Sequence, residues 1–198
     1  LVELLGVSTE TVRRDLEDLE NDNMLTRVHG GAVSVKKRYR FEDMDVRGTS
    51  NMELKEQIAR KALEYVKDGD TIAIDSGSTA SLFAMALKAR NFDSLSVITY
   101  SSEVFSILSE CGNYRITLLG GEYLPKEKLF YGFLTHEAMQ KLYFSKAFVV
   151  PSALSVEDGA HDFIRETYEN QCMLIGHASE VFLLADSTKF ETKGDFKL

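Results

Sequence analysis

The sequence predicts an α/β fold in which helices cover a mostly parallel, Rossmann-like sheet, preceded by a partial winged helix-turn-helix. Two patterns lead to this prediction. After Gly69, short apolar strands alternate with amphipathic helices, which implies right-handed crossovers and a parallel sheet. Before residue 36, two helical stretches around a tight turn precede two short strands around a glycine turn. We therefore expect one domain over residues 1–36, a linker over 37–49 and a second domain over 50–198.

The composition is that of a folded protein. Of the 198 residues, 44% are hydrophobic and 27% are charged, which excludes a disordered chain. Cys111 and Cys172 lie far apart and outside any Cys-x-x-Cys motif, so we expect buried thiols of a cytoplasmic protein and no disulfide, metal or cofactor. No apolar run approaches the roughly 20 residues of a membrane helix, so we expect no membrane contact. The chain starts without a Met and within a helical pattern, which indicates a fragment.

Charge is distributed unevenly along the chain. The net charge is -8, yet residues 1–40 carry seven Lys or Arg against seven Asp or Glu, and the remainder carries 16 against 24. The stretch Thr26–Arg40 holds five basic residues and no acid. A positive patch beside an acidic body suits a domain that touches nucleic acid while the rest does not.

The N-terminal elements predict a DNA-binding surface. Leu1, Leu4 and Leu5 have helical spacing, Gly6 ends that helix, and Ser8 is the expected N-cap of a second helix over 9–21. The second helix turns its apolar face inward and leaves polar residues outward near its start, where a helix-turn-helix meets bases and phosphates. A basic wing over 24–33 would follow. The expected DNA contacts are Thr9, Thr11, Arg13, Arg14, Arg27 and His29. The alternative is a helical hairpin with a solvated charged face.

The remaining elements follow in order. The stretch 36–48 is polar and has neither helical nor strand periodicity, which suggests the linker, and a helix over 51–66 opens the second domain. Strands are expected near 71–75, 95–99, 114–119, 146–150 and 180–185, and helices near 79–88, 102–110, 133–141 and 164–176. His136, His161 and His177 are scattered without ligand spacing, so we expect surface or partly satisfied side chains.

The loop after the first of these strands is the strongest candidate binding feature. A buried strand stops at Asp75, and Ser76, Gly77, Ser78 and Thr79 lead into a helix, which places amides and hydroxyls at the positive end of a helix dipole. Such a loop suits a phosphate. The alternative is that Ser78 or Thr79 merely caps the helix.

Other strand ends are polar or rich in glycine, and ligands collect at the carboxyl ends of parallel strands. Asp75 and Glu122 could accept hydrogen bonds from sugar hydroxyls, and Lys189 supplies a cation. Together these loops predict a sugar-phosphate pocket. Its expected residues are Asp75, Ser76, Gly77, Ser78, Thr79, Thr99, Ser101, Gly120, Gly121, Glu122, Asp186 and Lys189.

Two sets of motifs carry a family resemblance. Gly-Val-Ser-Thr-Glu-Thr-Val-Arg-Arg-Asp-Leu followed by Arg-Val-His-Gly-Gly-Ala resembles the DNA-binding signature of DeoR-type repressors of sugar metabolism. Asp-Ser-Gly-Ser-Thr, Leu-Leu-Gly-Gly-Glu, Gly132 and Leu-Leu-Ala-Asp-Ser-Thr-Lys-Phe are similar to the effector domain of that family. The resemblance covers nearly the whole chain. It implies that the family's first helix lies upstream of Leu1 and that a final strand lies beyond residue 198.

The resemblance also implies a function. The family's effector domain is related to ribose-phosphate isomerases and glucosamine-phosphate deaminases and binds a phosphorylated sugar without turning it over. Roles in or beside the pocket are implied for Ser76 to Thr79, Ser101, Gly120, Gly121, Asp186 and Lys189. Two departures are that Pro151-Ser152-Ala153-Leu154 replaces the usual Ala-Asp-Gly-Ile, and that Gln171 stands where a Lys is common. A different effector or a weakened response would follow from them.

Three functions are compatible with these patterns. The first is a repressor of a sugar-utilisation operon that binds double-stranded operator DNA, is released by a phosphorylated sugar, and forms a homodimer or homotetramer. The second is a sugar-phosphate isomerase or deaminase with Asp75 or Glu122 as general base. In the third, the N-terminal module binds DNA constitutively and the second domain serves only assembly. The exposed arginines of the N-terminal module favour the regulator over the enzyme.

Overall fold

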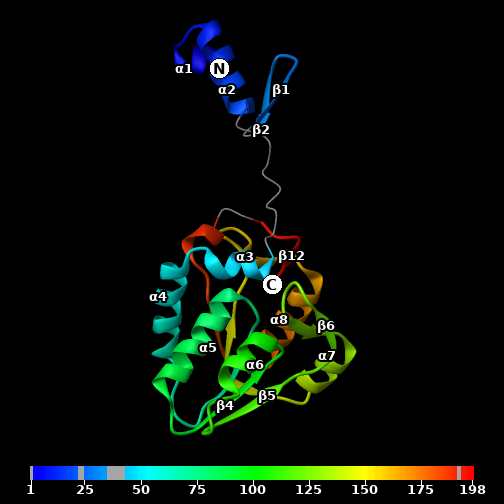
Figure 1. Cartoon of the computed structure of the whole chain (residues 1–198). Coiled ribbons are helices and arrows are strands. Elements are labelled where there is room, and N and C mark those ends of the chain that lie inside the picture. The colour runs from blue at the N-terminus through cyan, green and yellow to red at the C-terminus, as the bar shows by residue number, and fades with distance from the viewer. Residues whose placement is uncertain (1, 22–24, 35–42, 191–192) are drawn as a thin grey trace. The chain divides into compact units, whose positions relative to one another are not determined.

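The computed structural model describes residues 2–21, 25–34, 43–190 and 193–198 (Figure 1). The chain divides into two compact units, Leu1–Phe41 and Glu42–Leu198. Within the ranges described, no helix is both long and apolar enough to cross a membrane.

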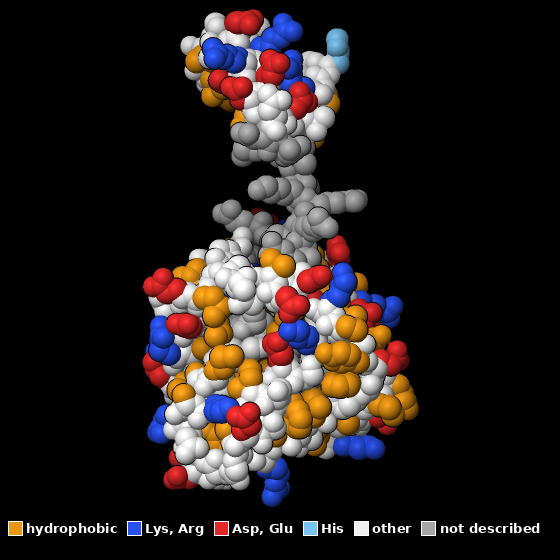
Figure 2. All heavy atoms as spheres, viewed as in Figure 1, with side chains coloured by type: hydrophobic (Ala, Val, Ile, Leu, Met, Phe, Trp, Pro, Cys, Tyr) orange, Lys and Arg blue, Asp and Glu red, His pale blue; other side chains and the backbone are white. Residues whose placement is uncertain are grey.

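The N-terminal unit is a helix-turn-helix followed by a hairpin. Helices α1 (Val2–Leu5) and α2 (Thr9–Asn21) precede strands β1 (Leu25–Val28) and β2 (Gly31–Ser34), which pair antiparallel. Gly6 at φ +66° and Gly30 at φ +86° make the two turns. Ser8 Oγ accepts a hydrogen bond from the Thr11 amide at 3.1 Å, which confirms the predicted N-cap. Basic and acidic side chains are interspersed on the surface of this unit (Figure 2).

The second unit is built on a five-stranded parallel sheet with the order β11-β8-β3-β4-β5. Its strands are β3 (Thr71–Ile74), β4 (Leu95–Thr99), β5 (Tyr114–Leu118), β8 (Phe144–Val149) and β11 (Ala178–Leu183). The chain adds β4 and β5 on one side of β3, then returns to add β8 and β11 on the other side. The strand order therefore reverses between β3 and β8, and the crevice outside the carboxyl ends of these two strands is where such sheets bind ligands.

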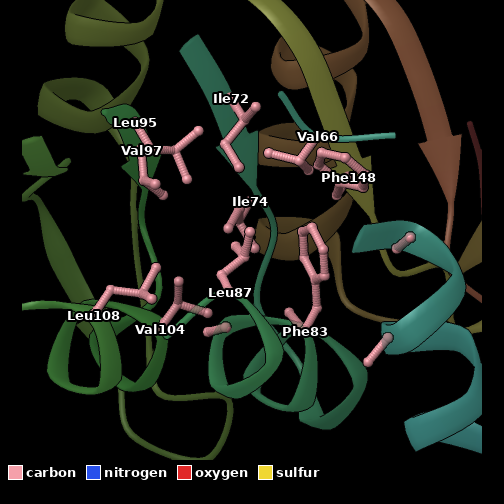
Figure 3. Packing of buried hydrophobic residues seen from close by; sticks show 14 of the residues in the cluster. Val66, Ile72, Ile74, Phe83, Leu87, Leu95, Val97, Val104, Leu108 and Phe148 are labelled. Atoms are coloured by element: carbon pink, nitrogen blue, oxygen red, sulfur yellow. The ribbon is translucent and has the colours of Figure 1, made fainter. Parts of the chain in front are cut away.

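Helices cover both faces of the sheet. One face packs against α4 (Met52–Leu63), α5 (Ser78–Arg90) and α6 (Ser102–Leu108), and the other against α7 (Phe133–Met139) and α8 (Arg165–Gly176). Strand alternation assigns the side chains to these faces, since Ile72 and Ile74 join the first cluster and Ala73 the second. Figure 3 shows Phe83 of α5 beside Phe148 of β8, with ring centroids 4.5 Å apart.

Short antiparallel elements extend the sheet's carboxyl side. Strands β6 (Glu122–Leu124) and β7 (Leu129–Tyr131) form a hairpin. Strands β9 (Ala153–Ser155), β10 (Gly159–Asp162) and β12 (Phe196–Lys197) form a three-stranded sheet. None of these strands was expected, because runs of two to four residues are too short to show a period of two.

Two further expectations need correction. Residues Met44–Thr49 form helix α3 within the stretch expected to be a linker, and Met44 is buried against the second unit. The predicted linker residues 37–42 lie outside the described ranges. His161 is 6% exposed, so it is not a surface histidine, and its Nδ1 has no hydrogen-bond partner among the described residues.

Candidate functional site

The loop between β3 and α5 presents backbone amides rather than a side-chain cap. Gly77 is the N-cap of α5, at φ +112° and ψ 162°, and no side chain makes a cap hydrogen bond there. The first helical bond runs from the Ser81 amide to the Gly77 carbonyl, so the preceding amides of Ser78, Thr79 and Ala80 have no acceptor within the helix. Neither Ser78 nor Thr79 caps α5 through its side chain, so the alternative of a mere helix cap is wrong.

Gly77 is favoured by its backbone conformation rather than by a lack of space. A Cβ built on Gly77 would lie 3.5 Å from Val150 Cγ1, immediately after β8, which is an ordinary contact. Its positive φ disfavours any other residue. Ser76, Ser78 and Thr79 are buried along with it. The loop is therefore packed against the other side of the strand-order reversal, as a ligand site in this type of sheet requires.

Asp75 lies beneath this loop with no exposed surface. Its Oδ1 accepts hydrogen bonds from the Ser76 amide at 2.6 Å and from the Tyr100 hydroxyl. Its Oδ2 accepts from the Val150 amide at 2.8 Å and from Gln171 Nε2 at 2.9 Å. Burial raises the pKa of Asp75 to about 6, against the lowering effect of these donors. The structure corrects the expectation that Asp75 faces a sugar, because it instead joins the ends of β3, β4 and β8 to α8.

Thr99 and Ser101 also make their hydrogen bonds within the protein. The Thr99 hydroxyl donates to the Ile74 carbonyl at 2.8 Å and accepts from the Ser101 amide at 3.0 Å. Ser101 Oγ accepts from the Val104 amide at 3.3 Å and caps α6. Both residues have no exposed surface, so they shape the loop after β4 from inside.

The two glycines after β5 differ from each other. A Cβ on Gly121 would lie 2.3 Å from Thr135 Oγ1 and 2.4 Å from the Tyr131 carbonyl oxygen, whereas one on Gly120 would meet nothing within 4 Å. Gly121 is thus required by packing against β7 and α7. Glu122 is exposed, and the Tyr131 hydroxyl lies 3.4 Å from its Oε2.

The last predicted loop is capped internally. Asp186 is buried, and its Oδ1 accepts from the Thr188 amide at 2.9 Å, which caps the short 3-10 helix η1 (Ser187–Lys189). Thr188 also receives a hydrogen bond from Asn51 Nδ2 at 3.3 Å, so the loop contacts the start of α4. Lys189 is half-buried at the end of η1.

The loop after β8 carries the departures from the family pattern. Ser152 Oγ donates to Asp162 Oδ2 at 2.9 Å, and burial raises the pKa of Asp162. Gln171 has no exposed surface; its Nε2 reaches Asp75, but its Oε1 has no partner among the described residues. The same holds for the buried Thr167 Oγ1, one helical turn earlier on α8. Buried polar atoms without partners are uncommon, so these two atoms are candidates for contact with a ligand.

Arg47 is a residue that the sequence did not indicate. It lies on α3, and its Nη1 is 4.0 Å from the Cβ position of Gly77. Its Nη2 forms an ion pair with Glu127 in the turn between β6 and β7. No sequence signal links Arg47 to a loop 30 positions away, because α3 is too short to show a helical period.

The predicted DNA contacts lie on the N-terminal unit. Thr9, Arg13 and Arg14 are exposed on the first half of α2, and His29 is exposed in the turn of the hairpin. Thr11 is also exposed, with its hydroxyl 2.8 Å from Ser8 Oγ. The half-buried Arg27 lies on β1, and its amide donates to Glu20 Oε1 at 2.8 Å.

A helix-turn-helix with a hairpin, joined to an α/β unit with an anion-type loop at its strand-order reversal, defines a DNA-binding regulator with a sensor domain. Models of two domains match the sequence. Residues 1–38 match the DeoR-like helix-turn-helix domain, and residues 50–198 match the DeoR C terminal sensor domain. The chain therefore belongs to the DeoR family of transcriptional regulators.

Several curated relatives carry the same name, lactose phosphotransferase system repressor. The chain is 38% identical to the protein of Lactococcus lactis subsp. lactis over 192 residues, which cover 96% of this chain and 75% of the relative. It is 38% identical to that of Streptococcus mutans over 200 residues, covering 99% and 77%. It is also 38% identical to that of Staphylococcus epidermidis over 202 residues, again covering 99% and 77%.

Solved structures with a similar fold include ribose 5-phosphate isomerases. The enzyme of Methanocaldococcus jannaschii aligns with a TM-score of 0.53 and 19% identity over 71% of this chain and 55% of that chain. The enzyme of Neisseria gonorrhoeae aligns with a TM-score of 0.53 and 16% identity over 71% and 54%. At this identity the likeness concerns the fold alone.

Proposed function

We propose that this protein represses a sugar-utilisation operon and that a phosphorylated sugar, bound in the crevice between β3 and β8, releases it from its operator. The observation that carries the proposal is the Gly77 loop at the strand-order reversal, where the amides of Ser78–Ala80 have no intrahelical acceptors. The helix-turn-helix and the names of the curated relatives support the DNA-binding half.

With its phosphate on this loop, the effector would extend its sugar towards the loop after β8 and towards α8. Gln171 Oε1 accepts hydrogen bonds only, so it suits a hydroxyl donor, and Thr167 Oγ1 suits either role. Three more of the residues predicted from the sequence remain proposed effector contacts, namely Lys189, Asp186 and Glu122. Because Ser152 and Gln171 are neutral, we expect hydroxyl groups rather than a charged substituent at this end of the effector.

We propose that the domain binds this ligand without turning it over. A general base must reach a substrate proton, but both oxygens of Asp75 already accept hydrogen bonds inside the protein. Glu122 is exposed and lies beside the Tyr131 hydroxyl rather than in a closed site. These contacts favour a sensor over an isomerase.

Assembly as a homodimer or homotetramer belongs to the same proposal. Operators of helix-turn-helix proteins are usually two-fold, which requires paired reading units. Exposed apolar side chains on the second unit suit such contacts (Figure 2), among them Tyr123 on β6 and Phe133 and Leu134 on α7.

The proposal is tested by calorimetry with galactose 6-phosphate, glucose 6-phosphate and fructose 6-phosphate, each beside its unphosphorylated sugar. We expect at least one phosphorylated sugar to bind. Its free sugar should bind far more weakly, because the backbone amides of the loop would have no phosphate oxygen to accept their hydrogen bonds. Gly77→Ala should reduce the affinity. Gly69→Ala is the matched control, since Gly69 has a similar positive φ at the opposite end of β3 and open space around it.

Operator release provides the second readout. A phosphorylated sugar that binds should weaken operator binding by the full-length protein in a mobility-shift titration. Equal affinity for a phosphorylated sugar and its free form would contradict the phosphate loop. Operator binding that no bound sugar changes would instead favour a sensor domain used only for assembly.

A further inference from the structure

Helix α3 is fastened to the β6–β7 turn. The Met44 amide donates to the Lys126 carbonyl at 3.3 Å, and Lys128 Nζ pairs with Asp45 Oδ1 at 2.7 Å. The Lys55 side chain, 3% exposed on α4, donates to the carbonyl of Arg47 at the other end of the helix. In the chain, α3 is the first described element of the second unit.

The Arg47 guanidinium lies between two sites for negative charge. On one side, Nη2 pairs with Glu127, whose side chain is 5% exposed against 12% for Arg47. On the other side, Nη1 lies 4.0 Å from the Cβ position of Gly77, at the start of α5. The same side chain therefore borders both a buried carboxylate and the loop proposed to bind the effector phosphate.

We propose that Arg47 is a ligand of the effector phosphate and that, on binding, it exchanges Glu127 for the phosphate, which loosens α3 from the β6–β7 turn. A phosphate near neutral pH carries close to two negative charges and three acceptor oxygens, so it competes well against one carboxylate for the guanidinium fork. The inference rests on the proposed function and adds to it a specific residue and a route from the effector to the start of the sensor domain.

An independent observation supports a ligand in this crevice. Gln171 Oε1 and Thr167 Oγ1 are buried, on one face of α8, and lack partners among the residues described. Gln171 is one hydrogen bond from Asp75, whose other oxygen accepts from the Ser76 amide. Gln171 is therefore linked through Asp75 to the loop that Arg47 borders.

Loss of Arg47 would change Glu127. Burial raises the pKa of Glu127 and Arg47 opposes that rise, while Asp162 on β10 and Asp43 before α3 add smaller raising effects. Without the guanidinium, the carboxylate would be a buried charge with less compensation, so it would take up a proton. The neutral carboxyl group would hold the turn less firmly to α3.

The test uses the full-length protein and the same three sugar phosphates. Arg47→Met should weaken binding of the phosphorylated sugar on the order of 10- to 100-fold, the range of a charge-assisted hydrogen bond, with little effect on the free sugar. Glu127→Gln should strengthen it several-fold, because the Glu127 carboxylate no longer competes with the phosphate for Arg47. Arg60→Met is the matched control, since Arg60 forms only an exposed pair with Glu56 on α4 in the described structure.

Proton exchange separates this mechanism from a merely structural ion pair. Calorimetry at one pH in PIPES and in Tris, whose ionisation enthalpies differ, should show more proton uptake on binding for the wild type than for Glu127→Gln. Thermal unfolding of each variant checks that it folds. If Arg47→Met does not fold, the test relies on Glu127→Gln, because glutamine has nearly the same shape as glutamate.

The outcomes distinguish the two proposals. A wild type that binds none of the sugar phosphates overturns the proposed function and the inference with it. A wild type that binds one, together with unchanged affinity in both variants or equal proton uptake in wild type and Glu127→Gln, overturns the role of Arg47 and leaves the proposed function standing.

Discussion

Replacing Gly121 by alanine should destabilise the sensor domain, whereas the same change at Gly120 should leave its stability unaltered. The added methyl at Gly121 would lie 2.3 Å from Thr135 Oγ1 and 2.4 Å from the Tyr131 carbonyl oxygen. Thr135 cannot turn away without loss, because its buried hydroxyl donates to the Gly120 carbonyl at 2.9 Å. Tyr131 contributes backbone, so β7 itself would have to move.

The magnitude follows from these two contacts. An ordinary carbon–oxygen contact is about 1 Å longer than either, and overpacking of this kind costs about 1–3 kcal/mol. Because one of the clashing atoms belongs to a strand, we expect the upper end, about 3 kcal/mol. For a domain of this size, that corresponds to a fall in Tm of about 6–12 °C.

Urea unfolding followed by circular dichroism would measure the free energy of unfolding of both variants. Gly120→Ala should lie within about 0.5 kcal/mol of the wild type, as surface changes usually do. If Gly121→Ala were as stable as Gly120→Ala, the packing role of Gly121 would be refuted. Loss of phosphosugar affinity in a stable Gly120→Ala variant would show that Gly120 contacts the ligand.

Three further predictions concern single residues. Burial raises the pKa of Asp75 from 3.8 to about 6, so the folded state holds this proton more tightly than the unfolded state and stability is lost as the pH rises through that interval. The unfolding free energy of the wild type relative to Asp75→Asn should therefore fall by about 2 kcal/mol between pH 4 and pH 7 in urea titrations; an unchanged difference would contradict the buried carboxylate. Arg14→Ala should weaken operator binding by about 1–3 kcal/mol if Arg14 reads a base, with Arg90→Ala in the sensor domain as control; unchanged affinity and salt dependence would exclude α2 as the recognition helix. Gly77→Ala should reduce phosphosugar affinity more than Gly69→Ala, and equal losses would indicate general strain rather than a ligand contact.

The parallel sheet could be predicted because its strands are apolar runs bounded by polar turns. The β3 strand, for example, is a buried apolar run that stops at Asp75 before a helix, and its place in the alternation of strands and helices locates it. The hairpin of Glu122–Leu124 with Leu129–Tyr131 and the helix Met44–Thr49 could not be predicted, since their elements are short and lie outside that alternation. Their positions depend on tertiary contacts such as the ion pair of Lys128 with Asp45.

The candidate site, like the fold, could be predicted from the sequence only in part. The sequence indicated the Gly77 loop, because strand, glycine and helix start are adjacent in the chain. It misjudged Asp75, because a carboxylate beside a loop looks like a ligand until the donors from Tyr100 and Gln171 are known. Arg47 was missed for the converse reason, since its neighbours at the site are distant in sequence.

The hydrogen bonds of Asp75 have a mechanical consequence. Its carboxylate joins the Ser76 loop, the Tyr100 end of β4, the Val150 end of β8 and Gln171 on α8, so these pieces of chain cannot separate without stripping donors from a buried charge. The carboxyl ends of β3 and β8 are therefore held together across the crevice. A displacement caused by binding would have to come from an element that Asp75 does not hold, such as α3, which would give the response a fixed direction.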